Sequence, residues 1–452
     1  MTRESWSGRY GFILATVGSA VGIGSIWKFP YEVGENGGGA FVLFYIAGLA
    51  LIVVPLMFAE FAIGRRGQGD AVTSITMVAV RHHASRWWAA AGLVGVITAF
   101  LILSFYSVIG GWTLAYAVDT IVSGLGTLEP REVRARYDSL LASPWRQLSY
   151  HALFLLCAIA IVARGIKGGI EAASMVLMPV LIVLMIALAT YSAMAGDLTA
   201  ALHYLFRPDW QSVSARAALD ALGLGFFSIG VGLGLMITYA AYADAGINLR
   251  QVAIVSVVAD TAISLMAGLA VFPIVFAYGL NPAGGPGLVF VTLPLAFAQM
   301  PFGAVAAAGF FLLLFIAALA SAISMLEIVV ALLTTHFRWP RSLASLVTGM
   351  ACFVFGIGTI LSFNRWAVWF PLDMVDRFAT ATVYDLLDYL TSNVLLPIGG
   401  LALALFAGWA LPTRMLEEEL SLTTAGASLL RALLRYIVPM VIGAIVLASI
   451  IL

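Results

Sequence analysis

An apolar segment near the N-terminus is long enough to cross a bilayer, yet Gly22 and Gly24 stand near its middle, where glycine makes a helix easiest to break. A break at membrane depth frees backbone groups that lipid cannot satisfy. The carbonyls of Ala20 and Val21 could then coordinate a cation, and the amides that begin the second half-helix near Gly24 could bind an anion. This stretch therefore predicts a site for a cation beside a carboxylate. The alternative is helix packing, because Gly18 and Gly22 also have the spacing of close helix contacts.

A second glycine-rich centre, at residues 226–234, lies inside another long apolar segment. Broken helices at corresponding positions of two halves are typical of inverted-repeat transporters, which hold their substrate near the bilayer midplane. The repetition favours a binding site over simple packing.

The ionisable residues inside apolar segments include Lys28, Glu60 and Asp260. A charge costs at least ~2.5 kcal/mol at the centre of a membrane helix, so each residue is a functional candidate. For Asp260 the alternative is a protonated carboxyl that is hydrogen-bonded within the bundle, and Glu60 is expected to cap amides of the second broken helix.

Two other functions compete with transport. An intramembrane enzyme could use Asp260 or Glu60, but no Ser/His, paired-aspartate or His-rich arrangement accompanies them at helical spacing. An ion channel is the other, and the need for a closed pocket at two helix breaks argues against it.

The composition indicates where the chain works. Its 452 residues are 62% hydrophobic and 10% charged, which indicates a polytopic membrane protein and excludes a soluble domain. The net charge of zero gives no reason to expect a nucleic-acid partner. Cys157 and Cys352 lie in apolar segments and are expected to be free thiols. No small-residue cleavage site follows a short apolar region, so the first segment is expected to be a retained helix and not a signal peptide.

Apolar runs of membrane-spanning length predict eleven transmembrane helices. The expected spans are 9–33, 40–64, 87–122, 148–163, 168–195, 216–243, 251–278, 302–335, 343–363, 377–410 and 432–452. The expected fold is an all-α polytopic membrane protein, a 5+5 inverted repeat with helices one and six broken. The first repeat is residues 1–200, the second is 201–410, and residues 411–452 add a cytoplasmic link and the eleventh helix. Placing the N-terminus in the cytoplasm puts most Lys and Arg residues inside and the C-terminus outside.

Three connections carry their own expectations. Segment 123–147 is a polar outer excursion with a short surface helix. Segment 279–301 is apolar and uncharged, so it is expected to fold back into the outer mouth as a lid. Segment 411–430, with its run of three glutamates, is expected to be a solvated helical face.

The chain resembles the neurotransmitter:sodium symporter family over essentially its whole length. The first stretch, residues 18–30, is followed by the family's motifs at 36–41 and 60–65, and residues 238–242 match its sixth helix. The resemblance implies a bacterial inner-membrane symporter in the lipid bilayer that imports a neutral, hydrophobic L-amino acid with one or two Na⁺ ions, by alternating access and without enzymatic activity.

The resemblance also assigns site residues, position by position. The substrate-binding residues are Ser19, Ala20, Gly22, Ile23, Gly24, Ile102, Tyr106, Ile109, Phe227, Ser228, Gly230, Leu233, Ser321 and Met325. The Na⁺ ligands are Gly18, Ala20, Val21, Ser25, Ser228, Asp260, Ala317 and Ser321. The gates are Lys28 with Asp388 outside, and Arg3 with Trp6 inside. Without the family match, the aromatic and aliphatic residues among these would be interpreted as core.

The kind of substrate follows from Gly22. Family members that carry amines without a carboxylate have an aspartate at this position, so its absence implies a substrate with its own acid group. Tyr106 is the hydroxyl expected to reach that carboxylate, and Phe227 is the hydrophobic cover. Gly230 stands where relatives often have serine, which leaves more room for a side chain.

Three positions at the sodium sites and the inner gate depart from the family pattern. Ser25 replaces an asparagine ligand, and Ala320 replaces a hydroxyl residue, so the second sodium site is weakened or recruits Ser324 or water. The alternative is that serines 321 and 324 only bond back to carbonyls one turn earlier. Thr335 stands where the acidic partner of Arg3 is expected. Looser sodium coupling than in the family at large is therefore predicted.

Chloride-dependent relatives have a neutral asparagine where this chain has Asp260. The chain keeps Tyr45, Ser228 and Ser264 of their chloride site but has Leu224 in place of a glutamine. The resemblance therefore implies transport without chloride, because the fixed carboxylate takes the place of the anion.

Overall fold

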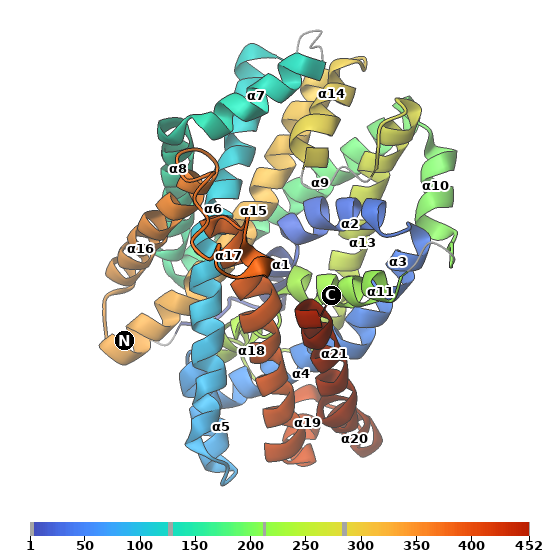
Figure 1. The fold of residues 1–452 in the computed structure, drawn as a ribbon. Coiled ribbons are helices and arrows are strands. Elements are labelled where there is room, and N and C mark those ends of the chain that lie inside the picture. Colours follow the sequence, from blue (N-terminus) through green and yellow to red (C-terminus); the bar gives the residue numbers. More distant parts are fainter. Residues whose placement is uncertain (1–3, 125–129, 211–213, 283–286, 452) are drawn as a thin grey trace.

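The computed structural model describes residues 4–124, 130–210, 214–282 and 287–451 (Figure 1). These residues form helices and no β-strand, with one isolated β-bridge between Gly38 and Pro208. The expected all-α membrane fold is confirmed.

The first and sixth spans are broken, as the sequence predicts. The first consists of α1 (Arg9–Ala20), the π-helical turn η1 (Gly24–Lys28) and α2 (Phe29–Glu35), and its two parts are bent by 50°. The sixth consists of α11 (Ala215–Ile229) and α12 (Leu235–Ala241). Between these two helices, glycines 230, 232 and 234 have φ angles of 70°, 94° and 73°, a region that glycine adopts without steric cost.

Nine further spans in the described residues are uninterrupted. Their elements are α3 (Gly39–Gly48), η2 (Leu49–Val53) and α4 (Val54–Gly67); η3 (Arg86–Trp88) and α6 (Ala89–Ser123); α8 (Pro144–Val162); η4 (Ile166–Glu171) and α9 (Ala172–Ala195); α13 (Leu249–Ala277); α15 (Gly303–Phe337); α16 (Arg341–Ser362); α17 (Val383–Tyr389), η7 (Leu390–Leu395), α18 (Leu396–Leu405) and η8 (Phe406–Ala410); and α20 (Thr424–Ala432), η9 (Leu433–Ile437) and α21 (Val438–Ile451). With the bent pair that forms the first span they make ten spans by length and composition in the described residues, and α11 with α12 would be the eleventh that the sequence predicts.

Two span boundaries differ from the expected ones by more than five residues. The tenth span begins at Val383 and not at 377, because Thr382 and Asp385 form a reciprocal capping box that starts the helix there. The eleventh begins at Thr424, where the Thr423 side chain accepts a hydrogen bond from the Gly426 amide. Hydrophobicity alone does not locate such caps.

Short helices cover the two ends of the bundle. At the upper end in Figure 1 lie α7 (Pro130–Ala142) and α14 (Leu293–Ala298), which follows η5 (Leu288–Thr292). At the lower end lie α5 (Ala71–Arg81) and α19 (Thr413–Leu420), together with α20. We refer to these as the α7 end and the α5 end. The remaining short elements are α10 (Leu198–Phe206) and η6 (Asp376–Phe378).

The connection at 279–301 folds back against the bundle, as expected, although residues 283–286 lie outside the described part. Leu288, Val289 and Leu293 are fully buried. The Phe290 ring lies 5.2 Å from the ring of Tyr116 on α6. The expected surface helix in 123–147 is α7.

The link before the last span is only partly the solvated face that the sequence predicts, because Glu418 is exposed but two of the three glutamates pair with arginines. On α19, the Glu419 carboxylate lies 2.6 Å from the guanidinium of Arg65, and Glu418 lies 2.7 Å from that of Arg66. The hydrogen bond from Arg66 lowers the pKa of Glu418. The acidic run therefore docks α19 on the end of α4, because two arginines are presented there.

Candidate functional site

A cavity lies between the two helix breaks, α6, α15 and α18. Its lining residues are Ser19, Gly22, Gly24, Ile102, Tyr106, Phe227, Ser228, Gly230, Leu233, Leu235, Ser321, Met325 and Leu396. Three of the expected substrate residues, Ala20, Ile23 and Ile109, do not line it. Leu235 and Leu396 do line it and were missed, because neither a charge nor a helix break marks them in the sequence.

The backbone around Gly22 leaves no space for a side chain. A Cβ atom at Gly22 would lie 2.5 Å from the Ser321 hydroxyl oxygen and 3.1 Å from that of Tyr106. The Ile23 amide donates a hydrogen bond of 3.2 Å to the Tyr106 hydroxyl. The first break therefore presents backbone groups to two hydroxyls, and none of the lining residues is acidic.

Asp260 is the centre of a buried oxygen cluster beside this cavity. Its carboxylate accepts hydrogen bonds from Ser25 at 2.5 Å, from Tyr45 at 2.9 Å and from Ser228 at 3.2 Å. The Ser25 and Ser228 hydroxyl oxygens are 2.9 Å apart. The Asp260 side chain is fully buried, and Tyr45 also reaches Ser264 at 3.4 Å. Three of the expected sodium ligands are thus brought together by η1, α11 and α13.

This cluster fits a sodium ion. Asp260 forms no ion pair with a Lys, Arg or His side chain within the described ranges. A buried carboxylate is stable when it is paired or binds a metal ion, and hydroxyl, carbonyl and carboxylate oxygens are the ligands that hard cations prefer.

The expected second sodium site is less complete. The Ser321 hydroxyl points across to α1, at 3.4 Å from the Ser19 carbonyl oxygen and 3.5 Å from that of Val21, and does not bond back along its own helix. Ser324, however, donates to the Ala320 carbonyl at 3.1 Å and pairs with the Tyr239 hydroxyl at 2.7 Å. Ser324 is therefore occupied, and of the two serines Ser321 alone approaches α1.

We expect Ala320→Thr to increase the apparent affinity for sodium several-fold, because it restores a hydroxyl one position before Ser321. The measurement is the sodium dependence of substrate binding. The wild type is expected to show a Hill coefficient near one, whereas a clear two-sodium dependence in the wild type would show that Ser321 and carbonyls suffice. Ser345→Thr, on α16 and away from the cavity, is the matched control.

Glu60 has the structural role that the sequence predicts. Its carboxylate accepts hydrogen bonds from the amides of Gly232 at 2.6 Å and Met236 at 3.2 Å. Glu60 is fully buried and satisfies amides that the second break frees.

The comparisons with known proteins agree with this geometry. A family model described as "Sodium:neurotransmitter symporter family" matches residues 3–128 and 146–451. The chain belongs to the sodium:neurotransmitter symporter family. It is therefore a multi-pass, sodium-dependent membrane transporter and not an enzyme.

Two relatives and one solved structure cover nearly the whole chain. The chain is 37% identical over 441 residues to "Uncharacterized sodium-dependent transporter YhdH" of Bacillus subtilis, over 97% of this chain and 95% of that protein. It is 32% identical over 428 residues to an "Uncharacterized sodium-dependent transporter" of Haemophilus influenzae, over 93% of this chain and 92% of that protein. The crystal structure of MhsT in complex with L-phenylalanine matches with a TM-score of 0.89 at 42% identity, over 99% of this chain and 100% of that one.

Lys28 and Asp388, the expected outer gate of a symporter of this family, do not pair with each other in this structure. The Lys28 ammonium lies 4.8 Å from the centre of the Phe227 ring, and Asp388 accepts a hydrogen bond of 3.1 Å from Ser392. Lys28 and Phe227 line a hollow of about 570 Å³ between α2, α11 and α21. Lys28 therefore contacts Phe227, the expected cover of the substrate, and not Asp388.

We expect Asp388→Ala to lower transport about tenfold or more, a loss of at least about 1.4 kcal/mol in the closing step. Folding should change little, because Asp388 forms no ion pair with any other described residue. Uptake and thermal melting of the variant are the measurements, and Lys28→Asp/Asp388→Lys should recover part of the rate. Asp373→Ala, an exposed acid nearby in the sequence, is the matched control. Wild-type uptake by Asp388→Ala would contradict the gate.

At the α5 end, Trp6 holds the N-terminal segment on the bundle, as expected for a symporter latch. Its indole donates a hydrogen bond of 2.9 Å to the Tyr239 carbonyl, and its amide donates one of 3.3 Å to that of Tyr242. Trp6 is 2% exposed. Arg3, its expected companion, lies outside the described residues.

Two charged residues next to this latch were missed. The guanidinium of Arg341 pairs with the Glu327 carboxylate and donates 2.8 Å to the Val162 carbonyl. Glu327 also accepts a hydrogen bond of 2.9 Å from the Tyr242 hydroxyl. The available signal was Glu327 itself, an ionisable residue inside the expected span 302–335.

Proposed function

We propose that this sodium-dependent transporter imports a neutral, hydrophobic L-amino acid together with Na⁺ by alternating access. We also propose that it works in the inner membrane of a bacterium, with the α5 end and the N-terminus in the cytoplasm and the C-terminus outside. The repeats would be residues 1–200 and 201–410, each with its first helix broken, followed by the link and last helix in 411–452.

One observation carries the proposal, namely the two different halves of the cavity. The backbone at Gly22 and the Tyr106 and Ser321 hydroxyls form a polar half that suits a carboxylate. Apolar side chains form the rest: Ile102, Phe227, Leu233, Leu235, Met325 and Leu396. Because no acidic side chain lines the cavity, the substrate must bring its own anion, as an amino acid does.

The apolar half supports a large hydrophobic side chain. Gly230 lines this part and has no side chain to fill it. MhsT, at 42% identity over nearly the whole chain, was solved with L-phenylalanine bound. Leucine-, methionine- and aromatic-type substrates are therefore favoured over charged ones.

Sodium would be held by the serines 25 and 228, the Asp260 carboxylate and the Ala20 carbonyl. The ion would compensate the buried charge of Asp260 and attract the substrate carboxylate. Ser321 with the carbonyls of Gly18, Val21 and Ala317 would hold a second ion.

The test is a binding panel of all twenty L-amino acids to the purified protein, with sodium and with potassium in its place. We expect sodium-dependent binding of hydrophobic amino acids, and binding of tyrosine about 100-fold or more tighter than tyramine, because a lost carboxylate leaves buried donors unpaired. Equal binding of tyramine would contradict the proposal. A channel is the competing function, and saturable uptake without an ohmic current would separate the two.

A further inference from the structure

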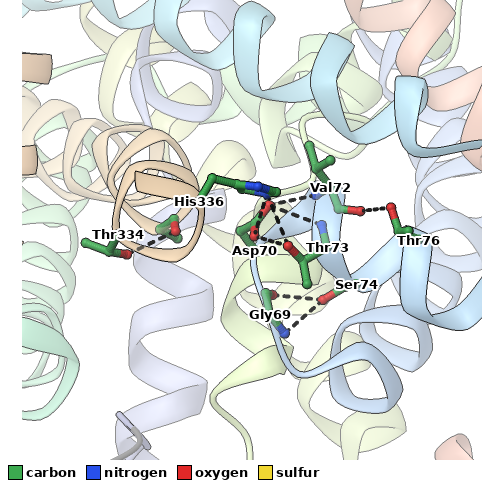
Figure 2. Close-up of polar contacts among 9 residues, drawn as sticks. Gly69, Asp70, Val72, Thr73, Ser74, Thr76, Thr334 and His336 are labelled. Atoms are coloured by element: carbon green, nitrogen blue, oxygen red, sulfur yellow. Dashed lines mark hydrogen bonds and ion pairs between the residues drawn. The ribbon is translucent and has the colours of Figure 1, made fainter. Parts of the chain in front are cut away.

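At the α5 end, a histidine in the last turn of α15 meets the residue that caps α5 (Figure 2). The His336 Nε2 atom lies 3.5 Å from the Asp70 carboxylate and 3.2 Å from the Thr73 hydroxyl oxygen. Thr73 in turn donates a hydrogen bond of 2.5 Å to Asp70. In Figure 2 the imidazole points from its helix toward this small cluster.

Asp70 is fixed in place, whereas His336 is accessible to solvent. The Asp70 carboxylate is fully buried and accepts hydrogen bonds from the amides of Val72 at 3.0 Å and Thr73 at 3.2 Å. A carboxylate at a helix N-terminus is stabilised in its charged form. The His336 side chain is 45% exposed, so it can exchange protons with water.

The segment that carries Asp70 also touches the second helix break. A Cβ atom at Gly234, the last residue of that break, would lie 2.7 Å from the Cβ of Ala71. A Cβ at Gly92 on α6 would lie 2.9 Å from the Cα of Val72. A movement of the broken span relative to α15 must therefore stretch or release the contact between Asp70 and His336.

Asp70 is the only carboxylate within 4.0 Å of His336 in the described ranges. The other charged residues on the helices around it are Glu60, Arg65 and Arg66 on α4, Arg81 at the far end of α5, Glu327 on α15 and Arg338 just after α15. Glu60 accepts its hydrogen bonds from the amides of Gly232 and Met236. The arginines of α4 pair with glutamates of α19. Glu327 pairs with Arg341 and lies about 13 Å from His336 along the axis of α15. Neither α12 nor the first turns of α6 carry a charge.

We propose that Asp70 and His336 form a proton-sensitive latch, in which His336 positions the Asp70 segment beneath the second break and must release it before substrate leaves at the α5 end. The proposal rests on the alternating-access symport proposed above. Thr335, next to His336, lacks the carboxylate expected for a latch with Arg3, and the histidine supplies a link at this point of α15.

The direction of the proton effect follows from the charges. Histidine is the side chain whose charge ordinarily changes between about pH 5 and 8. A proton bound to His336 would place a positive charge beside the Asp70 carboxylate and at the C-terminus of α15, where a positive charge is favoured. Acid at the α5 end should therefore tighten the latch and slow release by about two- to fivefold, the size expected for a half-exposed ion pair.

The test is sodium-driven uptake of L-phenylalanine into right-side-out membrane vesicles that contain the full chain, with internal and external pH varied separately between about 5.5 and 7.5. In the wild type, internal acid should slow uptake. His336→Gln keeps a neutral hydrogen-bonding group, and Asp70→Asn keeps the helix cap, so both variants should transport. In both, the slowing of uptake by internal acid, about two- to fivefold in the wild type, should disappear. His83→Gln, an exposed histidine at the other end of α5, is the matched control and should keep the wild-type profile.

Each outcome decides one proposal. The same pH profile in the wild type and in His336→Gln would overturn the latch, as would an effect of external pH alone. If Asp70→Asn does not fold, the His336→Gln profile decides. Absence of sodium-driven uptake at every pH would instead contradict the proposed function.

Discussion

Gly22→Asp is expected to abolish amino-acid binding, with a loss of about 100-fold or more, because a second carboxylate then occupies the place of the substrate's own. Steric crowding at Gly22 should weaken binding as well. A Cβ atom at this position already meets the Ser321 hydroxyl at 2.5 Å and the Tyr106 hydroxyl at 3.1 Å. Equilibrium binding of radiolabelled L-phenylalanine in saturating sodium is the measurement.

Two further variants separate charge from space. Gly22→Ala should weaken binding less than Gly22→Asp, because it adds the clash without the charge. Gly443→Ala on α21 is the matched control, since a Cβ atom there has no other atom within 4 Å, and it should bind as the wild type does. Binding of amino acids by Gly22→Asp at wild-type affinity would show that the substrate carboxylate lies elsewhere.

Replacing chloride by gluconate should leave wild-type transport unchanged, and Asp260→Asn should lose transport in that medium by about 100-fold or more. A carboxylate at ~4 Å from sodium contributes about 4 kcal/mol of attraction at an effective dielectric of 20, before desolvation, which is enough to take the place of a bound anion. Uptake in chloride and in gluconate is the measurement. Loss of wild-type activity in gluconate would contradict this role of Asp260.

Chloride should restore only a part of the activity of Asp260→Asn. Tyr45 and Ser228 remain around the site, but Leu224 offers no amide to hold the anion. Asp138→Asn, on the exposed surface of α7, removes a carboxylate far from the cluster and should transport normally in both media.

The broken helices could be predicted because their cause is local. Gly22 and Gly24 interrupt an apolar run, and glycines at 230, 232 and 234 have the positive φ angles that a break in the sixth span requires. The family motifs then placed Tyr106 and Ser321 at the first break, and the structure brings both hydroxyls to Gly22.

Other features depend on contacts between distant parts of the chain, which no local spacing reveals. The glutamates before the last span were expected to face water, yet Arg65 and Arg66 draw two of them onto α4. His336 and Asp70 meet across a long stretch of sequence, and each alone is an ordinary polar residue at a helix end. Leu396 reaches the cavity because α18 packs beside the second break, where a Cβ at Gly232 would lie 3.1 Å from the Leu396 carbonyl oxygen.

The most direct test of the central claim is uptake of radiolabelled L-phenylalanine into proteoliposomes that contain only the purified chain, with an inward sodium gradient. We expect accumulation above equilibrium that saturates with substrate, persists when gluconate replaces chloride, and disappears when the gradient is collapsed or potassium replaces sodium. Uptake that proceeds equally without a sodium gradient, or no uptake of any hydrophobic amino acid while tyramine is transported, would contradict the account.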